Sequence, residues 1–147
     1  MDQLLKTVSI FAGLNEPALN LFLEKAQKMV LSAGAIIARE GETNHCMFLI
    51  GSGSVRIVKG LGQPAETELA ILQAHDFFGE MCILEPAARA ASAQAVTRSV
   101  VFQVGASAFY HLYQEMPAQY GILILNISRD LSRRLRHLDE VFAARHK

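Results

Sequence analysis

Residues 77–92 read FFGEMCILEPAARAAS and interrupt a series of short apolar segments. Within this stretch two charged side chains, Glu80 and Arg89, stand among small and apolar residues. Burying either charge without a partner would cost several kcal/mol, so each of them must be satisfied. Two interpretations follow: a structural salt bridge between Glu80 and Arg89, or a pocket for an anion that also carries hydroxyl groups.

The residue types around this pair favour the pocket. The guanidinium of Arg89 can place two parallel N–H donors on two oxygens of a phosphate. The carboxylate of Glu80 only accepts hydrogen bonds, which suits a sugar hydroxyl. The run before Pro86 is compatible with a short helix, whose first N–H groups can point toward an anion. Ala90 and Ala91 leave room for the backbone to approach a ligand closely.

The segments on either side of this stretch predict β-structure. Residues alternate with period two at Val55 and Ile57 and again at Leu69 and Ile71, which indicates strands with one face inward. Glycines fall between the segments, where tight turns need them. Many short strands with regular turns predict a β-roll or jelly roll over residues 28–104. The expected strand segments are residues 29–32, 36–38, 47–50, 55–58, 67–72, 93–97 and 100–104.

Helical patterns flank this zone, so the expected fold class is α+β, mainly β. Residues 1–26 form an N-terminal helical part, in which Asn15 is the expected N-cap. Two C-terminal helices are expected, over residues 106–116 and 118–145, with Pro117 between them. The whole chain, residues 1–147, is therefore expected to form a single domain.

The last helix carries apolar residues at heptad a and d positions, although Arg134 fills one d position. Such a stripe predicts a homodimer through residues 118–145. The alternative is a helix that packs on the barrel of its own chain. The apolar heptad positions are Ile124, Ile127, Leu131, Leu138 and Val141.

The composition excludes several classes of protein. The chain has 147 residues, 51% of them hydrophobic, and no net charge, which argues against a surface built to hold nucleic acid. Residues 129–147 contain six basic and three acidic side chains, which we interpret as a solvated helix face rather than a polyanion site. No apolar run is long enough for a membrane helix, and the first residues do not resemble a secretory signal. Two distant cysteines fit a reducing compartment, so we expect a cytoplasmic protein.

Neither catalysis nor metal binding is indicated. His45 stands beside Cys46, but the sequence lacks a second pair of ligands at metal-site spacing. No nucleophile with a nearby base and an orienting group is apparent, and Ser92 has no evident partner. We therefore expect no enzyme activity, no metal and no cofactor.

The chain resembles the cyclic-nucleotide-binding domain family over almost its whole length. The specific part is the phosphate-binding cassette, residues 78–92, in which Gly-Glu and Arg-Ala stand at the spacing of that family. In that family the Glu binds the ribose 2′-hydroxyl, and the Arg together with backbone amides binds the cyclic phosphate. The resemblance thus implies roles for Gly79, Glu80, Met81, Cys82, Arg89, Ala90 and Ala91.

The resemblance also implies where the base would lie. Strand residues, here Ile57 and Leu69, line that side of the pocket in the family. Catabolite activator proteins place a Thr-Ser pair after the RRL of the long helix, whereas this chain has Leu138 followed by Asp139. Leu138 could instead cap the base by packing, as aliphatic residues do elsewhere in the family. Members that select cGMP often have Thr where this chain has Ala90, so cAMP is the expected ligand rather than cGMP.

Within the family the chain looks most like the sensor half of bacterial Crp/Fnr-type regulators. We expect a domain for signal transduction in transcription regulation, in which ligand binding moves the C-terminal helix. Those regulators continue into a winged helix-turn-helix, whereas this sequence stops at Lys147. Either it is a stand-alone sensor or the regulator is truncated, and no direct nucleic-acid binding is expected from these residues. The alternative function is a module for dimerisation that keeps the fold without a ligand.

Overall fold

Eight antiparallel strands form two facing four-stranded sheets in the computed structural model, which describes the backbone of residues 2–145 and the side chains of residues 3–81 and 83–145. One sheet has the order β1-β8-β3-β6 and the other the order β2-β7-β4-β5. The strands are β1 (Gln27–Leu31), β2 (Ile36–Ala38), β3 (Cys46–Ser52), β4 (Ser54–Lys59), β5 (Thr67–Gln73), β6 (Phe77–Phe78), β7 (Ser92–Ala95) and β8 (Ser99–Gly105). The expected jelly roll of mixed α+β class is confirmed.

Each strand segment expected from the sequence overlaps a strand of the structure, and β6 is an additional strand that was not expected. The shortest connection between two described strands is the single residue Gly53, which links β3 to β4. Gly53 has φ +92°, and a Cβ at this position would lie 2.3 Å from Oγ of Ser99. Both observations explain why the turn needs glycine, as the sequence indicated.

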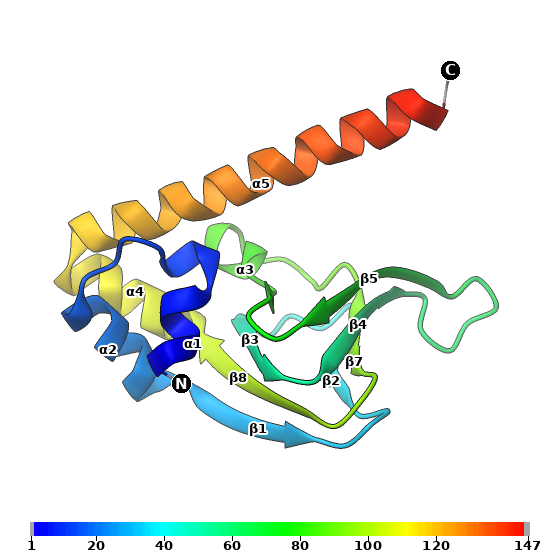
Figure 1. The fold of residues 1–147 in the computed structure, drawn as a ribbon, viewed down its shortest axis with the longest axis horizontal. Helices are drawn as coiled ribbons and strands as arrows, with labels where there is room; N and C mark the ends of the chain where they lie inside the picture. Colours follow the sequence, from blue (N-terminus) through cyan, green and yellow to red (C-terminus); the bar gives the residue numbers. More distant parts are fainter. Residues whose placement is uncertain (1, 146–147) are drawn as a thin grey trace.

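The helices gather at one end of the roll, and α5 starts there and runs diagonally over the roll, away from the other helices (Figure 1). At the N-terminus, Oδ1 of Asn15 accepts a hydrogen bond from the backbone N–H of Ala18, which confirms the expected cap. The described helices comprise α1 (Asp2–Thr7), the 3₁₀ turn η1 (Ser9–Phe11), α2 (Glu16–Lys25), α3 (Met81–Leu84), α4 (Ala106–Glu115) and α5 (Pro117–Arg145). Among residues 2–145, no helix combines the length and the hydropathy needed to cross a membrane.

The two halves of α5 differ in their surroundings. In the first half Leu123 and Ile127 are fully buried in the core that the helices share with β3 and β8. Asn126 holds this half in place, because its Nδ2 donates to the carbonyl oxygens of Ile10 and Ala12. Part of the expected dimer stripe therefore belongs to the core of its own chain, as the alternative interpretation predicted.

The second half of α5 extends past this core (Figure 1). Leu135 and Leu138 are each more than 60% exposed there. Among the heptad positions, Ile127 is buried in the core of its own chain and Leu138 is exposed, which shortens the stripe available for the expected homodimer.

Candidate functional site

Residues 77–92, which contain the cassette, form one wall of a cavity of about 640 Å³. The opposite wall comes from β4 and β5, and Arg134 of α5 closes one side. Most of the site residues expected from the sequence line this cavity, namely Ile57, Leu69, Gly79, Glu80, Met81, Arg89, Ala90 and Ala91. Cys82 contributes its backbone to α3, and its side chain lies outside the described part of the chain. Leu138 is exposed and is not among the residues that line the cavity.

Glu80 is the buried charge of the cavity. Only 2% of its side chain is exposed, and Oε1 accepts a hydrogen bond from Nη1 of Arg134 at 2.7 Å. Nη2 of the same guanidinium lies 2.9 Å from Oδ2 of Asp130, one helical turn earlier on α5. The guanidinium also lies over the ring of Phe77, 5.7 Å from its centre. The partner of Glu80 is thus the terminal helix, and the alternative of a Glu80–Arg89 salt bridge is wrong.

Arg89 is held by the loop before β3 rather than by a carboxylate. Its Nε donates to Oδ1 of Asn44 at 2.9 Å, and its Nη2 donates to the carbonyl oxygen of Cys46 at 2.7 Å. The guanidinium carbon lies 5.2 Å from the centre of the Phe48 ring. These contacts orient the guanidinium but bring no negative charge to it. A cation fixed in this way beside a cavity can bind an anion with little loss of side-chain entropy.

Contacts with the backbone of Arg89 and Ala90 hold this part of the cassette in place. The N–H of Arg89 donates to the carbonyl oxygen of Glu42, and its carbonyl oxygen accepts from Gly41. Nζ of Lys59 donates to the carbonyl oxygen of Ala90 at 2.8 Å, and so ties the cassette to the end of β4. The cassette is therefore fastened to the loop before β3 and to the end of β4, which keeps Arg89 in position.

Gly79 allows Arg89 to lie where it does. Its φ is +85°, a conformation that L side chains rarely adopt. A Cβ at residue 79 would also lie 2.8 Å from Nη1 of Arg89 and 2.9 Å from the carbonyl oxygen of Cys46. Any side chain at this position would displace the guanidinium. Steric exclusion therefore explains why glycine precedes Glu80 in the motif.

The remaining walls of the cavity are apolar. The residues that β4 and β5 contribute are all aliphatic, and Leu69 at the edge is 58% exposed. Met81, on the opposite wall, is 56% exposed. The cavity thus combines the buried acceptor Glu80 and the fixed cation Arg89 with aliphatic surface that a ligand could cover.

Sequence reasoning missed two residues that take part in this arrangement. Arg134 was noticed only as a charge within an apolar heptad stripe, and that anomaly was the available signal. Asn44 lies in an irregular loop, where no periodicity marks it. Each of them contacts a charged residue of the cassette from a distant part of the sequence.

The model of the cyclic nucleotide-binding domain matches residues 28–116, which include both sheets and the cassette. The chain belongs to this family, as the resemblance of its cassette indicated.

Similar proteins are regulators. The chain is 29% identical over 135 residues to the cyclic AMP receptor protein of Thermus thermophilus, covering 92% of this chain and 61% of that protein. It is 28% identical over 143 residues to the CRP-like cAMP-activated global transcriptional regulator of Mycobacterium tuberculosis, covering 97% and 62%. This chain therefore spans about six-tenths of the length of these relatives.

A solved structure with the same fold is the regulatory domain of Toxoplasma gondii PKA with cAMP. Its TM-score to this chain is 0.75 at 27% sequence identity, covering 90% of this chain and 48% of that one.

Proposed function

We propose that this chain is a sensor domain that binds a cyclic mononucleotide, cAMP in preference to cGMP, and couples binding to movement of α5. The observation that carries the proposal is the buried carboxylate of Glu80, which shares one cavity with the fixed guanidinium of Arg89. Arg89 would bind the cyclic phosphate, and Glu80 would accept a hydrogen bond from the ribose 2′-hydroxyl. The relatives described above are named for cAMP, which supports the same ligand here.

The ion pair between Glu80 and Arg134 supports the coupling. A ribose hydroxyl that reaches Glu80 must share the carboxylate with Arg134 or replace it. Either change alters what α5 contacts, so the ligand would bind two positions of α5 with different affinities. Leu138 lies one turn beyond Arg134 and would approach the base only if the second half of α5 moves toward β5.

The remaining parts of the proposal concern partners and location. We propose a homodimer through residues 118–145, with Leu135 and Leu138 in the interface, and a cytoplasmic location. We propose no catalytic activity for the chain, since its relatives are named as regulators.

Isothermal titration calorimetry of the full chain with cAMP and with cGMP tests the binding. We expect one site per chain, and loss of most of the affinity in Arg89→Ala. Absence of heat with both nucleotides, together with an intact thermal transition, would favour the alternative of a ligand-free module.

Amide hydrogen exchange over residues 118–145, with and without cAMP at one protein concentration, tests the coupling. We expect ligand to change the protection of the second half of α5. Unchanged exchange at saturating cAMP would leave the binding in place and remove the coupling.

A further inference from the structure

The polar and the apolar residues of the cavity are separated in space. The cassette and α5 supply Glu80, Arg89 and Arg134, which are the charged groups already described. The opposite wall receives only aliphatic side chains from β4 and β5, and these are Ile57, Leu69, Ala70 and Leu72. If a nucleotide binds with its phosphate at Arg89 and its ribose at Glu80, its base must lie against the aliphatic wall.

The backbone of this wall lies within the sheet, where β4 is paired on both sides and β5, the edge strand, is paired with β4 on one side. Ile57 is paired with Ala70 and Val55 with Leu72 in the antiparallel ladder between β4 and β5. Backbone donors and acceptors of a strand lie in the plane of the sheet, whereas side chains stand on its faces. The face that meets the cavity therefore offers methyl and methylene groups to a ligand.

Of the other polar side chains of the lining, Asn44 and Arg134 have partners within the chain, and Glu85 lies on the cassette side. Asn44 accepts the hydrogen bond of Arg89, and Arg134 contacts both Glu80 and Asp130. Glu85 is exposed just after the end of α3, on the cassette side. Ala90, directly after the arginine, has only a methyl group and offers no hydroxyl to a base.

We propose, on the basis of the proposed function, that this site reads the cyclic phosphate and the ribose and leaves the base unread. Bases differ in the pattern of donors and acceptors on their edges, and aliphatic side chains cannot distinguish such patterns by hydrogen bonding. A hydrophobic pocket also discriminates weakly between ligands of similar shape, whereas a site that hydrogen-bonds a ligand rejects its analogue strongly. Any preference for cAMP over cGMP and over cCMP should therefore stay within the range that hydrophobic pockets reach, at most about 200-fold.

The test is calorimetry of the full chain with cAMP, cGMP and cCMP, on the wild type and on two variants of β5. Leu69→Ala removes an exposed leucine that lines the cavity. Ile71→Ala is the matched control, because Ile71 is on the same strand and 44% exposed but does not line the cavity. We expect Leu69→Ala to weaken all three nucleotides by a common factor of about three to ten, and Ile71→Ala to change none of them.

The outcomes separate this inference from the proposed function. Dissociation constants within about 200-fold of one another support an unread base. A spread of more than about 200-fold, or a Leu69→Ala effect confined to one nucleotide, overturns it while the binding function stands. Failure of all three nucleotides to bind overturns the proposed function, and this inference with it.

Discussion

Two arginine–glutamate pairs of this chain have similar chemistry and different surroundings. Arg134 and Glu80 are 2.7 Å apart; the arginine is 49% exposed, whereas the glutamate is only 2% exposed. Arg56 and Glu66 are 3.5 Å apart, with side chains 26% and 35% exposed. Water and salt screen an exposed pair, whereas loss of Arg134 would leave the buried carboxylate of Glu80 without its partner. The first pair therefore matters far more to the molecule than the second.

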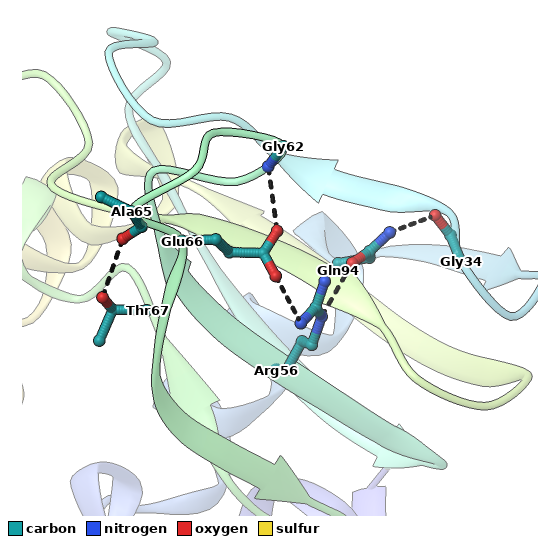
Figure 2. A network of polar contacts seen from close by, with 7 residues as sticks. All are labelled: Gly34, Arg56, Gly62, Ala65, Glu66, Thr67 and Gln94. Atoms are coloured by element: carbon teal, nitrogen blue, oxygen red, sulfur yellow. Dashed lines mark hydrogen bonds and ion pairs between the residues drawn. The ribbon is translucent and has the colours of Figure 1, made fainter.

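The two pairs also connect different things. Arg56, Glu66 and Gln94 fasten the loop between β4 and β5 to the neighbouring strand β7, and this network lies on the sheet itself (Figure 2). Glu80 and Arg134 join the cassette to α5, across 54 residues of sequence. Only the second connection can transmit an event in the cavity to the end of the chain. We therefore expect Glu80 and Arg134 to serve binding and signalling, and Arg56 and Glu66 to serve local stability.

Arg89→Ala should have the largest effect on binding. Loss of a charged contact to phosphate costs roughly 2–4 kcal/mol, which is about 30- to 1000-fold in the dissociation constant for cAMP. Arg89→Lys should restore only part of it, because ammonium lacks the planar fork. The measurement is calorimetry, with Arg56→Ala as the arginine control outside the cavity. Equal affinity in wild type and Arg89→Ala would remove the phosphate assignment.

Glu80→Gln should weaken cAMP by about tenfold, because an amide accepts a weaker hydrogen bond than a carboxylate does. The sharper readout is the penalty for 2′-deoxy-cAMP relative to cAMP. We expect this penalty to be smaller in Glu80→Gln than in the wild type, since part of the interaction with the hydroxyl has already been lost. An identical penalty in both proteins would mean that Glu80 does not contact the ribose.

Arg134→Ala should weaken cAMP by only about fivefold, at the low end of usual coupling energies, while changing α5 more than binding. Without Arg134 the ligand no longer alters a contact of the helix, so ligand-dependent protection of residues 133–145 should disappear. Hydrogen exchange measures this, with Arg133→Ala as the neighbouring control on the exposed side of α5. If Arg134→Ala keeps the protection change of the wild type, then the Glu80–Arg134 pair does not carry the signal.

The sequence predicted those parts of the fold that have a local pattern. Alternation and glycine spacing located seven of the strands, whereas β6 comprises only Phe77 and Phe78 and is too short for any periodicity to show. The cassette was recognisable because its charges stand in an apolar context. Its partners were not, because Arg134 and Asn44 lie 54 and 45 residues from the groups that they contact. Such proximity results from the packing of α5 and the loop before β3, and no one-dimensional spacing reports it.

Of the substitutions considered, Glu66→Gln should have the smallest effect on cAMP binding, because Glu66 belongs to the exposed pair. The backbone N–H of Gly62 donates to Glu66 and, with Arg56 nearby, holds the pKa of this exposed carboxyl below its ordinary value. A lowered pKa in the folded state stabilises the protein above the ordinary pKa of the carboxyl, and this stabilisation is lost as the pH falls through the folded pKa. The melting temperature of Glu66→Gln should therefore lie slightly below that of the wild type at pH 7.

Thermal unfolding at pH 7 and below pH 4 measures this difference, which should shrink at the lower pH because the wild-type carboxyl is then protonated as well. The dissociation constant for cAMP should be unchanged in Glu66→Gln, since this carboxylate does not line the cavity. A loss of affinity comparable to that of Glu80→Gln would show that the loop between β4 and β5 participates in binding. The division between a binding pair and a purely local pair would then have to be abandoned.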